Sequence, residues 1–396
     1  MNKFTEKENL ELLLSEPIAS VYQREQSTFD TLAVPFEKSI VLFGAGGLGK
    51  KTLAGLRSIG IEPLAFADNN STLWGKDING VQVMSVEDAA NKFGQNSVFV
   101  ITIWKGEAVD TMAERYQQLK KLGCARIVPF GYLYWKYSDV FLPHYAFDMP
   151  HKVFEQAKDA QNVFSLWEDD TSRYEYLAQL KWRMYMDFDG LPAPVAHEIY
   201  FPNDLVSILP DEIFIDCGAY DGDTVKSLLS TQGAYSGKII AFEPDPANFK
   251  QLEQYVLKLP QGIKERVSVY PFAVGARKSK VRFEASGTEA SAVGSGDLEV
   301  DCVALDEVLG KNKPTYIKMD IEGSELDALI GAKNIIRKNL PILAICSYHR
   351  QDHLWRIPAL IHSYADEYRF FLRPHLLEVW DLVCYAIPLN RLDIKR

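Results

Sequence analysis

Short apolar runs that alternate with amphipathic stretches mark two parts of the chain. The first part contains strand candidates at residues 39–43, 63–67, 98–103 and 126–129. The second part starts near residue 211 and contains strand candidates at residues 213–216, 238–242, 267–270, 316–319 and 341–347. Runs of this length, bounded by glycine and polar residues, are typical of strands that are buried on both faces. Because helical stretches separate the runs, each part is predicted to form a mostly parallel, doubly wound sheet.

A chain of 396 residues is too long for one ordinary core, and its pattern divides it into three segments. Residues 1–137 are predicted to form an N-terminal helix and a small Rossmann-like domain. Residues 138–210 are rich in aromatic and charged side chains and are predicted to form a mainly helical connector. Residues 211–396 are predicted to form the second α/β domain. Just before it, the aromatic segment 198–204 is predicted to form one wall of a ligand pocket.

The second domain departs from a simple strand–helix alternation near its end. Residues 280–283 are predicted to form a strand of a hairpin, followed by a polar loop at 287–297. A helix is predicted to run from about Glu325 to Lys338. The segments 368–375 and 383–388 are predicted to form a closing pair of antiparallel strands.

The composition excludes several classes of protein. With 47% apolar and 24% charged residues, the chain is predicted to be globular, and its formal net charge of −10 gives no broad basic surface for nucleic acid. The five cysteines contain no C-x-x-C pair, which argues against a disulfide framework and a zinc site. The charged N-terminus does not resemble a signal peptide, and no apolar run approaches the roughly 18 residues of a membrane span. A cytoplasmic location is therefore predicted.

A glycine-rich turn follows the first strand of the N-terminal domain. Gly44, Gly46 and Gly49 match the pattern G-x-G-x-x-G between a strand and a helix, and Asp68 ends the next strand. This arrangement predicts a site for a nucleotide or a nucleotide sugar, with Asp68 bound to ribose hydroxyls. The alternative is that the glycines only allow tight strand–helix packing in a domain that binds no ligand.

A second glycine turn, Glu212–Thr224, differs from the first in its charge. Asp216 ends its strand ahead of Gly218 and Gly222. A carboxylate at this position would repel a pyrophosphate, but it suits a ligand with a positive end, such as S-adenosylmethionine. Glu243 ends the following strand, where an acid can bind ribose hydroxyls. The alternative for Glu243 is a solvated acid at the end of a strand.

Longer motifs in the second domain identify a family. The segments F-I-D-C-G-A-Y-D-G-D-T, A-F-E-P-D-P-A-N-F, Y-I-K-M-D-I-E-G-S-E-L-D-A-L-I-G-A and Y-R-F-F-L-R-P-H…V-C-Y-A-I-P resemble, in this order, the FkbM-type methyltransferase family. The resemblance implies a class I methyltransferase fold, which is a doubly wound, mostly parallel sheet with an antiparallel terminal strand. It also implies S-adenosylmethionine as the methyl donor, and O-methylation of a hydroxyl on a sugar, glycan precursor or related natural product.

The family resemblance implies roles for residues at the strand ends. The implied cofactor-binding residues are Asp216, Gly218, Ala219, Tyr220, Gly222, Thr224, Glu243, Pro244, Asp245, Ala273 and Val274. The loop from Asp216 to Gly222 would lie at the methionine side, and Glu243 would hold the ribose. Ala273 and Val274 would lie along the adenine.

Methyl transfer to a hydroxyl requires alignment of the hydroxyl and, unless it is acidic, a base. Alignment alone can lower a barrier by roughly 7–11 kcal/mol. The family signature K-x-D-x-E-G-x-E is matched by Lys318, Asp320, Glu322 and Glu325. Asp320 is the first candidate for the reaction centre, and Glu322, His349 and His353 are further candidates for the base, His349 with a pKa suited to neutral pH. In the alternative, each histidine caps a helix or binds backbone, and Lys318 forms a structural ion pair. No metal is predicted, because the three acids of the signature do not share one helical face.

The N-terminal domain has a resemblance of its own. The segments L-F-G-A-G-G-L-G-K, F-A-D-N-N and G-K-D-I-N-G-V-Q-V resemble the small Rossmann-like domain of sugar-modifying enzymes, such as the sugar acetyltransferases of surface-glycan pathways. This domain would recognise a nucleotide-linked part of the methyl acceptor, or would serve in docking or in formation of a homo-oligomer.

The sequence therefore predicts an S-adenosylmethionine-dependent methyltransferase with a small-molecule or glycan acceptor. One alternative is an NAD(P)-dependent oxidoreductase centred on Gly44–Lys50, although no Tyr-x-x-x-Lys motif follows that domain. Another alternative is a non-catalytic regulatory protein that binds the cofactor without turnover.

Overall fold

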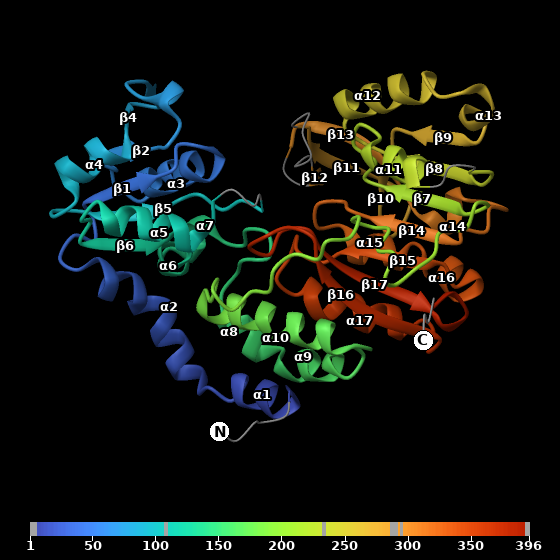
Figure 1. The fold of residues 1–396 in the computed structure, drawn as a ribbon, viewed down its shortest axis with the longest axis horizontal. Coiled ribbons are helices and arrows are strands. Elements are labelled where there is room, and N and C mark those ends of the chain that lie inside the picture. Colours follow the sequence, from blue (N-terminus) through green and yellow to red (C-terminus); the bar gives the residue numbers. More distant parts are fainter. Residues whose placement is uncertain (1–5, 107–109, 232–234, 286–291, 294–295, 393–396) are drawn as a thin grey trace. The chain divides into compact units, whose positions relative to one another are not determined.

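The computed structural model describes residues 6–106, 110–231, 235–285, 292–293 and 296–392 (Figure 1). These residues form two compact units, each assembled from segments that are discontinuous in the sequence. Unit 1 contains the residues up to Ala157, Leu177–Ala193 and Leu376–Trp380. Unit 2 contains Lys158–Tyr176, Pro194–His375 and the residues from Asp381 onward. The domain boundaries predicted after residues 137 and 210 stay a prediction.

Unit 1 is built on a six-stranded sheet in the order β3-β4-β2-β1-β5-β6. Its strands are β1 (Ile40–Phe43), β2 (Ala65–Ala67), β3 (Asp77–Ile78), β4 (Val81–Met84), β5 (Val98–Ile101) and β6 (Arg126–Pro129). All pairings are parallel except the one between β3 and β4. Every residue of β1, β2 and β5 is buried, which explains their uninterrupted apolar sequences. The four strands predicted for this part of the chain are confirmed.

Helices α3, α4, α5 and α6 pack against the sheet of unit 1. The helices of this part of the chain are α1 (Glu6–Leu13), α2 (Ile18–Ala33), α3 (Gly47–Ser58), the 3₁₀ turn η1 (Ser71–Leu73), α4 (Val86–Phe93), α5 (Met112–Lys121), α6 (Phe130–Lys136), α7 (Ser138–Phe141) and α8 (His151–Glu155). Helix α5 begins at a capping box in which Thr111 and Glu114 satisfy each other's backbone N–H groups. This cap fixes the start of α5 at Met112.

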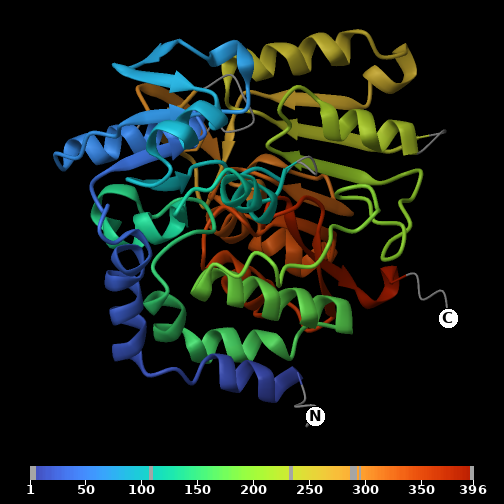
Figure 2. The same cartoon turned by 60° about the vertical axis from the view of Figure 1, so that its left-hand side comes forward.

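Unit 2 is built on a seven-stranded sheet in the order β16-β17-β15-β14-β7-β8-β9 (Figure 2). Its strands are β7 (Ile213–Cys217), β8 (Lys238–Phe242), β9 (Val267–Tyr270), β14 (Tyr316–Met319), β15 (Ile342–Cys346), β16 (Tyr368–Pro374) and β17 (Leu382–Pro388). Strand β17 runs antiparallel to both neighbours, and the other pairings are parallel. The predicted parallel sheet and the closing antiparallel pair are therefore confirmed.

A smaller sheet in unit 2 has the order β10-β13-β11-β12. Its strands are β10 (Ala273–Val274), β11 (Ser279–Glu284), β12 (Ala292–Val293) and β13 (Leu298–Val303). The predicted strand at 280–283 lies within β11 and pairs antiparallel with β13. Strand β13 was not predicted, because charged residues interrupt its apolar positions. The predicted polar loop at 287–297 falls largely on residues outside the described part of the chain.

The remaining helices are α9 (Ala157–Phe164), α10 (Asp170–Tyr185), α11 (Asp223–Thr231), α12 (Pro246–Leu257), α13 (Gln261–Lys264), α14 (Leu305–Val308), α15 (Glu325–Ile330), α16 (Lys333–Asn339), α17 (His353–His362) and the 3₁₀ turn η2 (Leu389–Arg391). The single helix predicted from Glu325 to Lys338 is wrong, because the chain breaks it between α15 and α16. A Cβ on Gly331 at this break would lie 2.1 Å from the carbonyl oxygen of Gly275, so the close approach requires glycine.

The helices of the predicted connector extend only to Tyr185. Residues 186–212 contain neither a helix nor a strand. Among the described residues, no helix combines the length and the hydropathy that crossing a bilayer requires.

Candidate active site

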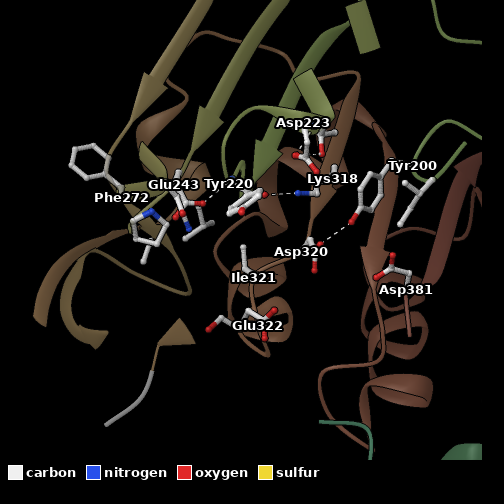
Figure 3. Close-up of a pocket in the computed structure, with 18 of the residues that line it drawn as sticks. Tyr200, Tyr220, Asp223, Glu243, Phe272, Lys318, Asp320, Ile321, Glu322 and Asp381 are labelled. Atoms are coloured by element: carbon white, nitrogen blue, oxygen red, sulfur yellow. Dashed lines mark hydrogen bonds between the residues drawn. The ribbon is translucent and has the colours of Figure 1, made fainter. Parts of the chain in front are cut away.

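A cavity opens at the carboxyl ends of the strands of unit 2 (Figure 3). Residues that end or follow β7, β8, β9, β14 and β15 line it. Ligands of open parallel sheets bind at this edge, near the point where the strand order reverses, which here lies between β7 and β14. The cavity volume is about 190 Å³. Because pockets for whole ligands usually measure roughly 300–1,000 Å³, a larger ligand would extend into the open mouth.

The turn after β7 is shaped by close backbone contacts. Gly218 has a φ of +79°, and a Cβ on it would lie 1.8 Å from the carbonyl oxygen of Asp320. Glycine is therefore required where the turn passes the end of β14. Tyr220 has a φ of 47° and donates its backbone N–H to the carboxylate of Glu243 at 2.9 Å. This bond ties the turn to the end of β8.

Glu243 presents a carboxylate that two backbone N–H groups hold in place. Its Oε2 accepts the bond from Tyr220, and its Oε1 accepts a bond of 2.8 Å from Asp245. Burial raises the pKa of Glu243 to about 7, although the two donors act in the opposite direction. Each carboxylate oxygen has a second lone pair, so Glu243 can still accept hydrogen bonds from hydroxyls of a ligand in the cavity.

Asp216 and Lys318 form a buried ion pair. They are direct neighbours on β7 and β14, so their side chains leave the sheet on the same face. Lys318 Nζ lies 3.1 Å from Asp216 Oδ1 and donates to the carbonyl oxygen of Gly218 at 2.5 Å. Lys318 lines the cavity, whereas the fully buried Asp216 does not. Asp216 is therefore not placed to contact a ligand directly.

The ionisation of this pair follows from its burial. Burial raises the pKa of Asp216 to about 6, against the opposing effect of Lys318. For Lys318, burial lowers the pKa, but Asp216 and Asp320 outweigh it and leave the pKa raised. Because Lys318 offsets its charge, Asp216 alone does not give the turn a preference for a cation.

Asp320 lies at the end of β14 with its carboxylate at the cavity (Figure 3). Its Oδ2 accepts a hydrogen bond of 2.8 Å from the Tyr200 hydroxyl, and its Oδ1 lies 3.3 Å from Nε2 of His349. Tyr200 is itself fixed, since it donates its backbone N–H to the Tyr385 hydroxyl and accepts a bond from the Tyr316 hydroxyl. Burial raises the pKa of Tyr200 well above its usual value, so this side chain stays a neutral donor.

His349 follows β15 and lies among three carboxylates. Its Nδ1 is 2.7 Å from Glu325 Oε1, and its Nε2 is 3.6 Å from Glu322 Oε1 as well as 3.3 Å from Asp320. Burial lowers the pKa of His349, but Glu325 and Glu322 outweigh it, so the pKa lies well above 6.5. A protonated imidazole cannot accept a proton, and His349 does not line the cavity. These observations argue against the predicted role of His349 as a base at neutral pH.

The two sides of the cavity differ in character. Figure 3 shows Phe272 near Glu243 on one side and Tyr200 near Asp381 on the other. The apolar lining residues at the Glu243 side are Pro244, Phe272, Ala273, Val274 and Phe283. This surface suits a flat ring beside the carboxylate that can bind hydroxyls.

The sequence of this region matches the family model described as the methyltransferase FkbM domain, over residues 216–376. These residues form an FkbM-type methyltransferase domain. The crystal structure of methyltransferase FkbM from Methylobacillus flagellatus KT is similar to the chain, with a TM-score of 0.75 and 21% sequence identity, over 96% of this chain and 97% of that one. The predicted class I methyltransferase fold is thereby confirmed.

Two further solved structures match about half of the chain. The SAH-bound methyltransferase PaMTH1 from Podospora anserina has a TM-score of 0.27 and 11% identity, over 45% of this chain and 71% of that one. The precorrin-6y C5,15-methyltransferase from Geobacter metallireducens GS-15 has a TM-score of 0.29 and 11% identity, over 46% of this chain and 81% of that one. No curated protein matches the sequence. The matches to the FkbM domain do not support the oxidoreductase hypothesis.

Within the FkbM domain, most of the predicted site residues come together. The predicted residues that line the cavity are Gly218, Tyr220, Thr224, Glu243, Pro244, Ala273, Val274, Lys318, Asp320 and Glu322. The predicted residues that do not line it are Asp216, Ala219, Gly222, Asp245 and His349. Asp245 instead caps α12, because its Oδ1 accepts hydrogen bonds from the backbone of Ala247 and Asn248.

Several residues that line the same cavity were not predicted. They are Asp223, Asn248, Phe272, Phe283, Ile321, Ser324, Tyr348 and Asp381. Ile199 and Tyr200 also line the cavity, and both belong to the segment 198–204 that was predicted to form a wall. Asp381 precedes β17 and has a φ of 48°. No local motif marks it, because the fold brings it to the site from far along the chain.

One cluster of the FkbM domain bears on the prediction that no metal is bound. Asp320, Glu325 and His349 each place one possible ligand atom within 4.8 Å of the others. The spacing of the acids along the chain therefore does not exclude a metal site, since three separate elements bring these groups together. In the structure the cluster is an ion-paired network around His349.

The first glycine turn lies outside the FkbM domain, at a separate cavity of unit 1. Gly44, Gly46 and Asp68 line that cavity. Gly49 does not, and a Cβ on it would lie 1.9 Å from the carbonyl oxygen of Gly44. Gly49 is thus required for helix–strand packing.

Proposed function

We propose that the protein transfers a methyl group from S-adenosylmethionine to a hydroxyl of a sugar, glycan precursor or related natural product. The observation that carries this proposal is the carboxylate of Glu243, held by the N–H groups of Tyr220 and Asp245 beside an apolar surface. Such a carboxylate suits the ribose hydroxyls of a nucleoside, and the apolar residues next to it suit a flat base.

The charge of the cavity supports a cationic donor. Among the described residues, five carboxylates and one ammonium group line it. The acids are Asp223, Glu243, Asp320, Glu322 and Asp381, and the ammonium group belongs to Lys318. A pyrophosphate would be repelled by this surface, whereas a sulfonium and an ammonium would be attracted. In this account Asp216 acts indirectly, by holding Lys318 against the glycine turn.

The residues at the other side of the cavity would hold the acceptor. When bound, S-adenosylmethionine supplies an electrophilic methyl group, and S-adenosylhomocysteine remains after the transfer. The carboxylate of Asp320 would accept a hydrogen bond from the reacting hydroxyl and orient its oxygen. Tyr200 and the protonated His349 would keep that carboxylate in one orientation. The hydroxyl proton would move to Asp320 as the new C–O bond forms.

The acceptor side favours a polyhydroxylated molecule. Asp320, Glu322 and Asp381 present several acceptor oxygens for hydrogen bonds, and the Tyr348 side chain also lines this region. Hydroxyl groups of a sugar can each donate to such oxygens. An anionic acceptor group close to them would be repelled.

Cofactor affinity is expected to depend on pH through Glu243. Its pKa of about 7 means that the carboxylate is largely protonated at pH 6 and largely ionised at pH 8. If the ribose binds the ionised form, affinity for S-adenosylhomocysteine falls by about tenfold from pH 8 to pH 6. Calorimetric titration at several pH values measures this change. In Glu243→Gln the affinity is expected to be weak and nearly independent of pH; an equally steep dependence in that variant would assign it to another group.

Activity is tested by incubating the protein with S-adenosylmethionine and a panel of sugars and nucleotide sugars. Formation of S-adenosylhomocysteine together with a methylated product supports the proposal. Binding of the cofactor with no product from any acceptor in the panel would favour the regulatory alternative. Failure to bind the cofactor at all would overturn the proposed function.

A further inference from the structure

We propose that unit 1 contains a second ligand site, which binds a ribonucleoside diphosphate. The site is a cavity of about 510 Å³ at the carboxyl ends of β1, β2 and β5. This volume lies within the roughly 300–1,000 Å³ of typical ligand pockets. The order of the sheet reverses at β1, which is the position where open parallel sheets bind their ligands. The proposal does not depend on the methyltransferase function of unit 2.

Packing within the protein does not require glycine at two positions of the turn after β1, Gly46 and Gly47. Gly44 has a φ of +118°, and a Cβ on Gly49 would strike the backbone, so these two positions are fixed by the fold. Gly46 and Gly47 differ, because no described residue other than their chain neighbours and the adjacent helix backbone has an atom within 4 Å of a Cβ built on either one. Both line the cavity. The space that their side chains would fill is therefore part of the ligand site.

The backbone at Gly46 and Gly47 suits a diphosphate. Gly46 is the N-cap of α3, and no side chain of the described residues caps this helix. The first N–H groups of a helix have no partner within it, and a helix N-terminus carries a partial positive charge. Without side chains at Gly46 and Gly47, an anionic group can approach these N–H groups closely.

Asp68, which follows β2, is held by the same pattern of backbone hydrogen bonds as Glu243 in unit 2. Asp68 Oδ2 accepts a hydrogen bond of 2.7 Å from Ala45 in the glycine turn, and Oδ1 accepts one of 2.8 Å from Asn70 two residues ahead. Glu243 likewise accepts from Tyr220 in its glycine turn and from the residue two ahead. In both units this pattern fixes a carboxylate beside the cavity, with lone pairs left for the hydroxyls of a ribose.

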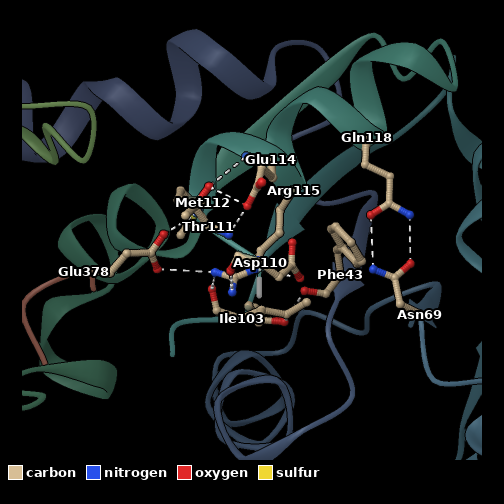
Figure 4. A network of polar contacts seen from close by, with 11 residues as sticks. Phe43, Asn69, Ile103, Asp110, Thr111, Met112, Glu114, Arg115, Gln118 and Glu378 are labelled. Atoms are coloured by element: carbon tan, nitrogen blue, oxygen red, sulfur yellow. Dashed lines mark hydrogen bonds and ion pairs between the residues drawn. The ribbon is translucent and has the colours of Figure 1, made fainter. Parts of the chain in front are cut away.

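The charged groups that line the cavity of unit 1 are compatible with a phosphate, whereas those of unit 2 are not. In unit 1 two acids and two basic groups line the cavity, namely Asp68, Asp110, Lys105 and Arg115. The Arg115 guanidinium is fixed by Asp110 and Glu378, and Asn69 forms two hydrogen bonds with Gln118 (Figure 4). The wall is therefore preorganised, and the charged groups that line the cavity carry no excess of negative charge. The cavity of unit 2, with its five carboxylates, does not meet this condition.

Calorimetric titration of the full chain with ADP, UDP, UDP-glucose and NADH tests the proposal and separates the sources of the ligand. At least one of these is expected to bind at one site per chain, and AMP about tenfold more weakly than ADP, because it lacks the second phosphate. Tightest binding of UDP-glucose would identify a nucleotide sugar, and tightest binding of NADH a dinucleotide. No binding at millimolar concentration would overturn the proposal.

Variants locate the site. Gly47→Val should weaken binding at least about tenfold while the protein stays folded, because Gly47 lines the cavity and a Cβ added there has open space around it. Gly262→Val is the matched control, since it also has open space around its Cβ but lies outside both cavities, and it should bind normally. Equal affinity in Gly47→Val and wild type, or displacement of the nucleotide by S-adenosylhomocysteine, would contradict a site in unit 1.

Discussion

Replacing Lys318 with methionine is expected to lower the free energy of unfolding of unit 2 by about 3–5 kcal/mol, because it leaves the buried Asp216 carboxylate without its partner. The loss should be smaller at pH 5 than at pH 8. The pKa of Asp216, already raised to about 6, would rise further in the variant. When the pKa of a carboxyl group is higher in the folded state than in the unfolded state, the free energy of unfolding is larger at low pH. It decreases as the pH rises through the folded-state pKa.

Hydrogen exchange of the amides of β7 and β14 measures this effect on unit 2 alone, since a chain with two units need not unfold in one step. The double variant Asp216→Asn with Lys318→Met is the control, and it should recover part of the loss because no buried charge remains. A loss below about 1 kcal/mol in Lys318→Met would mean that the pair is hydrated and that Asp216 is not held as described.

Replacing Asp320 with asparagine is expected to lower kcat by about 10²–10⁴-fold, because the variant cannot take the proton of the acceptor hydroxyl. Its side chain can still accept the hydrogen bond from Tyr200, so the cavity should keep its shape. Affinity for S-adenosylhomocysteine should change little, since Glu243 and the apolar residues hold that ligand in this account. Steady-state kinetics with the acceptor found in the panel measure the change.

Two further variants separate the roles of base and orienting group. Tyr200→Phe removes one donor to Asp320 and should lower kcat by less than Asp320→Asn does. The remaining activity of Asp320→Asn should increase with pH if hydroxide replaces the missing base. Activity of Asp320→Asn close to that of the wild type would exclude Asp320 from the reaction centre.

The main elements of the fold could be predicted from local sequence. Buried parallel strands have continuous apolar sequences, and the glycine turns after β1 and β7 mark the positions where strands lead into helices. Strand β13 could not be predicted in this way, because three of its six positions face solvent and two of these, Glu299 and Asp301, carry charges. The break at Gly331 could not be predicted either, since it depends on contact with Gly275, which is distant in sequence.

The candidate site was predictable where it consists of strand ends. Glu243, Asp320 and Ala273 each lie at or next to the end of a strand, and the fold brings such positions to one edge of the sheet. Asp381 comes from the connection between antiparallel strands, so no motif marks it. The pKa of His349 was mispredicted, because it depends on carboxylates that only the folded chain brings around the imidazole.

The pairing register of β7 and β14 explains why Asp216 does not line the cavity as the sequence suggested. Asp216 stands ahead of the glycines in sequence, which suggested contact with a cation. In the fold it pairs with Lys318, its direct neighbour on β14, and Lys318 takes the place at the cavity. Strand register was not deducible from the two motifs taken separately.

The most direct test of the account is the titration of S-adenosylhomocysteine into three proteins at pH 8: the wild type, Glu243→Gln and Gly47→Val. We expect one binding site per chain in the wild type, a loss of affinity of at least about tenfold in Glu243→Gln, and no change in Gly47→Val. Absence of binding to the wild type, or loss of binding in Gly47→Val with normal binding in Glu243→Gln, would contradict a methyl-donor site in unit 2.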